Sequence, residues 1–479
     1  MAADVTTSRH IGSWPVAITV TTALFVVVYG WSTTAQLHHF NVFAWDFAIF
    51  DQGLWLLSHF HDSFVTVRGL GLFADHSSYV MVLLAPLYRI WAAPEALIMI
   101  TVASLAAGIP ISYALARSLG GSPALSALVA GGYLIHPAIS WNLWEGFHPE
   151  VLAVPLVLGA VLLIAKQRDV WALALLAVAL LVKEDVGVLI APLGVYVAWG
   201  MGKRRTGWLM AGAGVVALAV NFAVILPLLS PTGAPIYADR YARFGEGVLG
   251  VARGVITHPG AALSEVFAGD AVLYAASLVL PIAVCLLAPA VLSVGIPAYL
   301  VNALSSSPYQ TDIRYHYTLY LLVVVVLAAA VGAGRLAAWP DGPRRAMAAT
   351  TIALSVVLAA VVGPGPFDRS GVWRRPDPAA EALAAAVAMV PGDAVVSAWD
   401  TTVPLLSHRR EIYVFPVPWQ VEGYGELEDS PPDPGSVEWV LVRRDQYQDL
   451  QPLVDELLAD PSYEIVLDRP PVLLLHRHP

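Results

Sequence analysis

Apolar segments long enough to cross a bilayer recur along most of this chain, from near Gly12 to about Gly363. Each measures about 17–25 residues, the length that an α-helix needs to span the hydrocarbon core. Hydrophobic residues fill 57% of the positions and charged residues 13%, which is about half the charged share of a soluble domain. We therefore expect an α-helical polytopic membrane protein with roughly 11–13 membrane helices.

Charge and cysteine content exclude several classes of function. Acidic residues outnumber basic ones, 36 to 26, and no Lys/Arg-rich tract occurs, so nucleic-acid binding is not expected. The single Cys285 excludes an intrachain disulfide and a cysteine-based metal cluster. The first apolar run exceeds the apolar core of a secretion signal, so we interpret it as a retained membrane helix.

Basic clusters set the expected orientation, because short cytoplasmic loops are enriched in Lys and Arg. The clusters are 166–168, 203–205 and Arg335 with 344–345. Placing them in the cytoplasm puts the N-terminus there too. It also collects several polar segments on the outer face: a first outer loop 34–78, then 141–150, 183–185, a long outer loop 230–270 and 305–316.

Residues 79–117 leave two alternatives open. They could hold two short spans, which would put Arg117 outside. Alternatively, 79–91 forms an interfacial or re-entrant helix and Arg117 stays cytoplasmic. The run 170–201 is too long for one span, and three adjacent charges at 183–185 interrupt it. It is therefore expected to be a helical hairpin whose tip lies at the outer face.

Composition changes after Gly363, so we expect a membrane domain at 1–363 and a separate domain at 364–479. The tail is rich in Pro and charge and has no spanning segment. Its patterns predict helices at 380–390 and 446–459, with strands at 393–399, 411–415, 438–442, 463–467 and 472–476. These signals indicate a small extracytoplasmic α/β domain.

The first outer loop carries two carboxylates among aromatic residues, Asp46 and Asp51. On one helix they would lie about 140° apart and would not share a face. A carboxylate at a membrane boundary can take a proton from an acceptor hydroxyl. Asp46 is therefore the candidate reactive base, and Asp51 a second candidate catalytic residue. The alternative is an interfacial helix whose Asp residues face water.

Four further clusters lie on the same expected face. Lys183 and Arg314, with His316, could hold a phosphate, although an internal ion pair or an aromatic belt would explain the same residues. The candidate pocket residues are Asp75, His76, His148, Glu150, Glu184, Asp185, Tyr315 and Tyr317. His148 and Glu150 with Asp46 could bind a divalent metal, but their spacing is not diagnostic, and no metal ligand is assigned.

The ordered motifs resemble those of the bacterial DUF2079 membrane proteins. They are Trp45–Gln52, Ala74–His76, Phe147–Glu150, Lys183–Asp185 and Arg314–Tyr317, with Pro391–Ser397 and Leu406–Tyr413 in the tail. That family is similar to the GT-C superfamily of polyprenyl-phosphate-sugar-dependent glycosyltransferases. The resemblance implies a GT-C-like helical module in a bacterial plasma membrane, with Asp46 matching the acid of the first outer loop. Here Trp45-Asp46 replaces the adjacent acidic pair of several GT-C families.

The resulting hypothesis is an inverting sugar transfer from a polyprenyl-phosphate-sugar lipid to a glycan, lipid or protein acceptor. Two alternatives belong to other classes: a transporter or flippase of a lipid-linked or anionic solute, and a non-catalytic membrane scaffold. A transporter would spread its polar residues along a path through the membrane.

Overall fold

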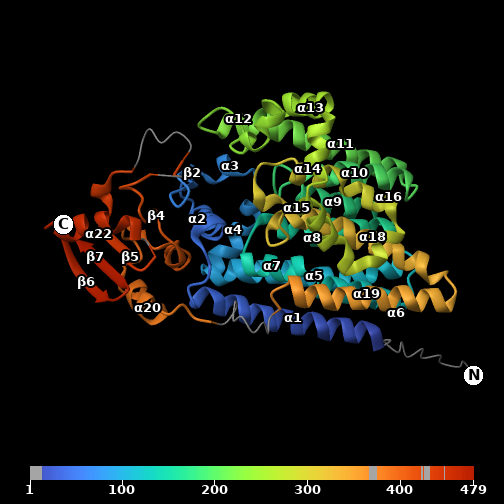
Figure 1. The fold of residues 1–479 in the computed structure, drawn as a ribbon, viewed down its shortest axis with the longest axis horizontal. Coiled ribbons are helices and arrows are strands. Elements are labelled where there is room, and N and C mark those ends of the chain that lie inside the picture. The colour runs from blue at the N-terminus through green and yellow to red at the C-terminus, as the bar shows by residue number, and fades with distance from the viewer. Residues whose placement is uncertain (1–12, 366–374, 422–423, 426–431, 447, 479) are drawn as a thin grey trace, which may run out of the picture.

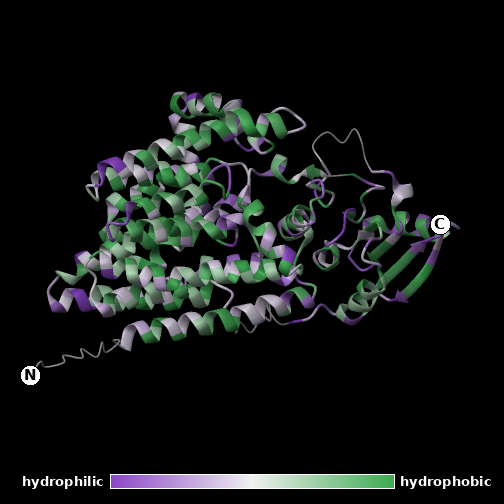
Figure 2. Ribbon diagram, turned by 180° about the vertical axis from the view of Figure 1, so that it is seen from behind, coloured by the Kyte–Doolittle hydropathy of each residue, from purple (hydrophilic) through white to green (hydrophobic). Residues whose placement is uncertain are grey.

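The computed structural model describes residues 13–365, 375–421, 424–425, 432–446 and 448–478. Figure 1 shows a bundle of roughly aligned helices beside a smaller tail that contains the sheet. The start of helix α1 (Ser13–His38) lies at the side of the bundle away from the tail. Figure 2 shows hydrophobic residues throughout the bundle and hydrophilic residues at helix ends and connecting loops.

Within the described residues, seven helical segments are long and apolar enough to cross a membrane. They are α1 (Ser13–His38), α5 (Pro94–Ser118), α6 with α7 (Pro123–Leu134, Pro137–Glu145), α11 to α12 (Arg204–Val220, Leu226–Leu229), α15 with η5 (Gly269–Val279, Leu280–Leu287), η8 with α18 (His316–Thr318, Leu319–Ala337), and α19 (Asp341–Val362). Shorter apolar helices complete the bundle: α4 (Val80–Ile90), η2 with α8 (Pro149–Leu152, Ala153–Ala165), α9 (Asp169–Ala179), α10 (Gly187–Trp199), and α16 to α17 (Pro289–Leu292, Ile296–Ala303).

Helix α18 forms the centre of the bundle. It is apolar on all sides and packs against α5, α6, α8 and η5. A helix without a polar face is expected to be buried in this way. Helices α10 and α11 approach closely through small residues. A Cβ at Gly194 or Gly207 would collide with the partner backbone, so glycine is what permits this contact.

The expected hairpin at 170–201 is present as α9 and α10, and Lys183 lies in the turn between them. The stretch 79–117 contains one short helix, α4, followed by the single long helix α5. Helix α4 has 11 residues, the same length as α9 in the hairpin, so its length does not decide between the two alternatives for 79–91.

Two loop boundaries differ from expectation. Helix α1 continues to His38, because residues 34–38 still bury one face against the bundle although they include polar side chains. The long loop at 230–270 is largely helical, with η4 (Ala238–Phe244), α13 (Gly247–Thr257) and α14 (Pro259–Val266). Amphipathic sequences can form short helices at a membrane surface even where no span is possible.

The first outer loop contains η1 (Ala44–Ala48), α2 (Ile49–Ser58), a β1–β2 hairpin (Phe64–Val65, Leu70–Gly71) and α3 (Leu72–Asp75). Residues of α2 bury a broad apolar face, and α2 packs against η1 and α4. The loop is therefore a folded layer between the bundle and the tail, not an extended connection.

The tail follows the expected order of elements. It contains α20 (Ala380–Met389), β3 (Val396–Ala398), η9 (Asp400–Thr402), α21 (Val403–Leu406), β4 (Ile412–Val414), η10 (Pro434–Ser436), β5 (Trp439–Arg443), η11 (Gln448–Leu450), α22 (Gln451–Ala459), β6 (Tyr463–Arg469) and β7 (Val472–Arg477). The strands form one sheet in the order β4-β3-β5-β7-β6. Strands β4, β3 and β5 are parallel, and β7 and β6 are added antiparallel.

Candidate active site

Asp46 lies in a kinked turn between α1 and α2. Its backbone has φ 69° and ψ −67°, and Trp45 before it is extended. A positive φ is rare for a residue with a side chain and persists only where the surroundings impose it. The kink leaves the Asp46 side chain 52% exposed while its neighbours Ala44 and Phe47 are fully buried.

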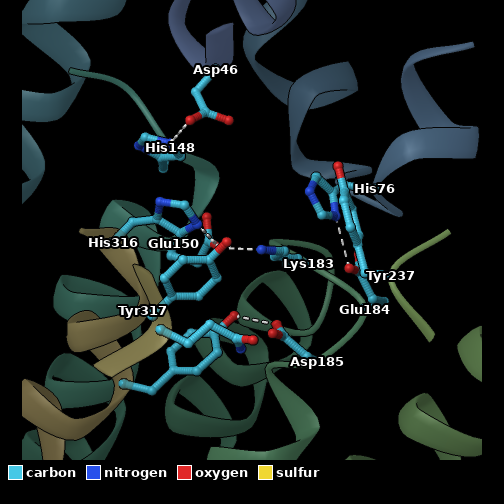
Figure 3. A network of polar contacts seen from close by, with 12 residues as sticks. Asp46, His76, His148, Glu150, Lys183, Glu184, Asp185, Tyr237, His316 and Tyr317 are labelled. Atoms are coloured by element: carbon cyan, nitrogen blue, oxygen red, sulfur yellow. Dashed lines mark hydrogen bonds and ion pairs between the residues drawn. The ribbon is translucent and has the colours of Figure 1, made fainter. Parts of the chain in front are cut away.

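His148 lies directly beside Asp46, as Figure 3 shows, with its Nε2 atom 3.3 Å from Asp46 Oδ2. Gly146 makes this approach possible. It ends α7 with φ 104°, and its Cα faces the Phe47 ring so closely that an added Cβ would lie 3.2 Å from it. The imidazole itself is almost completely buried, so it contacts the carboxylate from the protein interior and leaves the exposed side of Asp46 open.

His148 and His316 form a stacked pair, with ring centroids 3.8 Å apart and an interplanar angle of 18°. His316 enters the site at the start of α18. Glu145 at the end of α7 serves both rings: its Oε1 lies 3.0 Å from His316 Nδ1 and 3.8 Å from His148 Nε2. Glu145 was not among the sequence candidates, although it falls in the polar segment 141–150.

Lys183 is buried in the α9–α10 turn and pairs with Glu150, whose Oε1 lies 2.5 Å from Lys183 Nζ. The internal ion pair weighed above as an alternative is therefore present. Glu150 also lies 3.7 Å from His316 Nε2. A buried Lys requires such a partner, and the pair fixes a positive charge one side chain away from the histidine stack.

A second arm of the site joins the first outer loop to the long outer loop. His76 Nδ1 lies 2.9 Å from Glu184 Oε1, and the His76 ring stacks on Tyr237. Tyr237 donates a hydrogen bond of 2.8 Å to Asp75. Asp75, His76 and Glu184 were all sequence candidates, whereas Tyr237, in the long outer loop 230–270, was not.

Arg240 is a further residue that the sequence did not assign to the site. Its guanidinium lies over the Tyr237 ring and donates to the Tyr317 hydroxyl at 3.2 Å. Tyr317 also faces Lys183, with Nζ 5.9 Å from the ring centre. Among the residues that the structure describes, no carboxylate lies within ion-pair distance of Arg240. Its signal was the mixture of Tyr and Arg residues in η4.

A small cavity extends behind His316. It is lined by Glu150, Asp185, Val188, Ala298, Val301, Asn302, Gln310, His316, Tyr317 and Tyr320. Asp185 accepts a hydrogen bond of 2.7 Å from Tyr320 at this wall. The candidate residues Glu150, Asp185 and Tyr317 therefore share a polar chamber next to the histidine stack.

Three sequence candidates lie outside this cluster. Asp51 is fully buried in α2, where Tyr88 and Ser407 donate to it and His408 Nε2 lies 3.0 Å from Oδ2. Arg314 pairs with Asp312 at 2.6 Å, and its side chain is half exposed. Tyr315 packs on Tyr309. Their proposed roles in catalysis or phosphate binding stay predictions.

Charge around Asp46 favours its ionised form. Desolvation works to raise the pKa of Asp46, but the facing His148 outweighs it and holds that pKa well below its usual range. Burial likewise works to lower the pKa of His148, yet the Glu145 and Asp46 carboxylates raise it to about 9. Asp46 and His148 therefore form a carboxylate–imidazolium pair at neutral pH.

The same balance holds in the second arm. Burial and the Lys183 cation work to lower the pKa of His76, but Glu184 and Asp75 raise it above its ordinary value. Burial raises the pKa of Asp185 to about 6, because its two carboxylate neighbours add to the desolvation and Lys183 only partly offsets them. His76 is thus stabilised as a cation by its carboxylate neighbours, whereas the neighbours of Asp185 favour its protonated form more than usual.

Glu145, His148 and His316 offer ligand atoms within 4.8 Å of one another, so they are the residues that could hold a metal ion. Imidazole donates to a metal through a lone pair in the plane of its ring. In the stacked pair the two ring planes are nearly parallel, so lone pairs in those planes do not converge on one point between the rings. A shared ion would require the rings to turn away from each other.

Comparison with known proteins settles the family. The family model described as "Predicted membrane protein (DUF2079)" matches residues 36–474. The chain belongs to this family. The match covers the first outer loop, the bundle and nearly all of the tail, so the DUF2079 module includes both Asp46 and the sheet.

Solved structures show the same fold. The chain is similar to ArnT from Cupriavidus metallidurans, a GT-C glycosyltransferase, in the apo state, with a TM-score of 0.54 and 13% sequence identity over 97% of this chain and 98% of that one. A second ArnT structure from the same organism, bound to undecaprenyl phosphate, aligns with a TM-score of 0.49 and 13% identity over 96% and 97% of the two chains. No curated protein matches the sequence significantly. The DUF2079 chain therefore has a GT-C fold.

Proposed function

We propose that this DUF2079 protein is an inverting membrane glycosyltransferase that uses a polyprenyl-phosphate-sugar donor. Asp46 acts as general base: it takes the proton from an acceptor hydroxyl as that oxygen attacks the anomeric carbon. The bond from that carbon to the phosphate oxygen breaks, and the polyprenyl phosphate leaves with the electron pair. The GT-C fold supports glycosyl transfer as the class of reaction, and the geometry around Asp46 supports its assignment as the general base.

The observation that carries the proposal is the carboxylate of Asp46, half exposed and only 3.3 Å from the buried His148. A general base must be ionised, reachable by its substrate and fixed in place. The imidazolium keeps Asp46 ionised, and the kinked turn presents it at the surface of the site. Buried polar atoms nearby, including Glu145 Oε2 and His148 Nδ1, have no hydrogen-bond partner among the described residues, as expected where a polar ligand completes the bonding.

Cations on the other side of the site suit a leaving phosphate. Lys183 is held by Glu150, whereas Arg240 is partly exposed and, among the described residues, its guanidinium donates a hydrogen bond only to the Tyr317 phenol. Arg binds phosphate oxygens through two parallel N–H donors. We assign the phosphate contact to Arg240 together with Lys183 and keep Arg314 as a candidate at the rim. ArnT has been crystallised with undecaprenyl phosphate, which makes that lipid a suitable first probe.

Chain direction supports an outer-face site. Asp46 contacts His148, so if α5 and the α6–α7 segment each cross the membrane once between these residues, α4 does not cross. If 149–165, 169–179, 187–199, 289–303 and the other long helices also cross once each, the ends that carry Asp46, His148, Lys183, Arg240 and His316 all fall on one side. The basic clusters at 166–168 and 203–205 fall on the opposite, cytoplasmic side. The tail also lies outside in this arrangement.

The transporter alternative requires polar groups spaced along a path through the bundle. The central helix α18 is instead apolar from Leu319 to Gly332. The titratable residues gather at its first turn, around His316. This clustering favours chemistry at one membrane face over passage through the protein.

The test is transfer by purified protein from a panel of radiolabelled polyprenyl-phosphate sugars, with cell-envelope extract as the source of acceptors. Wild type should transfer at least one sugar, and Asp46→Asn should lose nearly all turnover, about 10³-fold or more, while binding donor normally. Asp62→Asn changes an exposed carboxylate in the same loop and should leave activity intact. Full activity in Asp46→Asn would show that Asp46 is not the general base. Parallel reactions with EDTA test the metal alternative.

A further inference from the structure

The segment that carries Asp46 is held by the tail. Ala44, two residues before Asp46, donates its backbone N–H to Asp400 Oδ1 at 2.6 Å. Asp400 begins η9 in the tail, more than three hundred positions along the chain. Both η9 and α21 pack directly on the kinked turn η1. The strained backbone of Asp46 therefore contacts the bundle on one side and the tail on the other.

The flanks of the turn are tied to the same part of the tail. On the C-terminal side, the buried Asp51 accepts a hydrogen bond from Ser407 and pairs with His408. Gln52 donates to the backbone carbonyls of Arg409 and Arg410 at 3.3 and 3.2 Å. Residues 400–410 thus bind positions 44, 51 and 52, which bracket Asp46.

Contacts farther upstream complete the attachment. Asn41 donates to the Arg375 carbonyl at 2.9 Å, and Asp377 donates its backbone N–H to the His39 carbonyl at 3.0 Å. Gln36, at the end of α1, bonds both Asn41 and Trp144. Residues 39–52 are therefore hydrogen-bonded to the tail on both sides of Asp46, and Ala44 between them is bonded to Asp400.

We propose that Asp400 is a positioning residue for Asp46, through which the tail fixes the catalytic turn. This inference rests on the proposed function, since it assigns Asp400 a role only through the Asp46 base. A backbone held at positive φ is strained and relaxes unless neighbouring contacts over-determine it. Asp400 supplies such a contact to the amide of Ala44, two residues before Asp46. Donor-binding residues come from other elements, so Asp400 acts on turnover and not on donor affinity.

The first experiment is independent of activity. Hydrogen–deuterium exchange of the peptide covering 40–48 is measured on the full chain in nanodiscs. Asp400→Ala should speed exchange in this peptide about 10-fold or more, because the amide loses its acceptor. Asp400→Asn keeps an acceptor oxygen and should exchange like wild type. Asp449→Ala, an exposed carboxylate in the same tail, is the matched control.

The second experiment measures kinetics with the donor found active. Asp400→Ala should lower kcat about 10–100-fold, the effect of displacing a reacting group by about 1 Å, with donor KM within about 3-fold. Asp400→Asn should restore most of the turnover. Ala44→Pro removes the same hydrogen bond from the other partner. The preceding Phe43 is extended, as a residue before Pro requires, so this variant should reproduce the Asp400→Ala effect.

The outcomes separate this inference from the proposed function. Unchanged exchange of this peptide in Asp400→Ala, together with unchanged exchange of its other amides in Ala44→Pro, whose position 44 has no amide hydrogen, overturns the positioning role, whatever the activity. A rise in donor KM that accompanies the fall in kcat also overturns the positioning role, because such a rise indicates a damaged donor-binding site. If Asp46→Asn stays active while exchange responds as expected, the proposed base is wrong but the contact between tail and turn is real. If Asp400→Ala does not fold, Ala44→Pro decides the question through kcat and the exchange of the remaining amides of the peptide.

Discussion

Asp46 Oδ2 lies 3.3 Å from His148 Nε2, joining the end of the first membrane helix to the turn that follows α7. The imidazole is buried and the carboxylate is half exposed, so the pair has a protected side and an open side. This asymmetry suits a base: the imidazolium holds the carboxylate ionised without blocking its approach to a substrate.

The pair predicts a pH profile. Asp46 has a lowered pKa, so the acid limb of kcat/KM should lie below the ordinary range of an aspartate, and the alkaline limb should fall near pH 9, where His148 loses its proton. In His148→Gln the cation is gone, the pKa of Asp46 rises, and the acid limb should move to higher pH. Initial rates across the pH range check this. An unshifted acid limb in the variant contradicts the pairing.

Asp51 is expected to matter more for stability than for turnover. Asp51→Ala leaves Tyr88, Ser407 and His408 without their buried acceptor, a loss of about 3–5 kcal/mol. Asp51→Asn keeps the acceptor oxygen and should fold with kcat close to wild type. Thermal unfolding in detergent and the transfer assay measure the two effects separately. A folded Asp51→Asn protein without turnover would instead support the catalytic role predicted from the sequence.

Docking of the tail should weaken at high pH. Burial works to lower the pKa of His408, but Asp51 outweighs it and raises that pKa above the ordinary value of 6.5. The Asp51–His408 pair then contributes fully below the unfolded pKa and loses its contribution as pH rises through the raised folded pKa. At low pH, His408→Gln should lower Tm by about 2–4 °C, and this difference should shrink at alkaline pH.

The control for that measurement is His258→Gln, which changes an exposed histidine in the long outer loop. It should show no pH-dependent difference from wild type. A His408→Gln effect of constant size from acid to alkaline pH would mean that packing, not charge, joins the tail to α2.

Arg240 should contribute more to donor affinity than Arg314. Arg240 faces the cluster through Tyr237 and Tyr317, whereas Arg314 is already paired with Asp312. Arg240→Ala should raise the Kd for undecaprenyl phosphate about 10-fold or more, the loss expected for a charged hydrogen bond. Arg314→Ala should change it about 3-fold or less. Arg205→Ala, at the opposite helix end, controls for the change in net charge. If Arg240→Ala and Arg314→Ala raise the Kd equally, Arg314 also contributes to phosphate binding.

Much of the fold could be predicted from local pattern. Apolar length indicated the membrane helices, the charges at 183–185 indicated the hairpin of α9 and α10, and alternation in the tail indicated each strand of its sheet. These signals are local, because a helix or strand must present an apolar face to bury or span. Residues 79–91 stayed ambiguous, since a short apolar helix has the same pattern whether it crosses a membrane or lies on it.

The sequence by itself determined which polar residues border apolar segments: Asp46, His76, His148, Lys183 and His316 each do so. Only the tertiary structure decided their partners, because pairing depends on how helix ends meet in space. It paired His148 with Asp46 and Lys183 with Glu150, brought Glu145 and Arg240 to the cluster, and buried Asp51 against His408. It also set Asp400 against Ala44, a contact between distant segments for which no local periodicity exists.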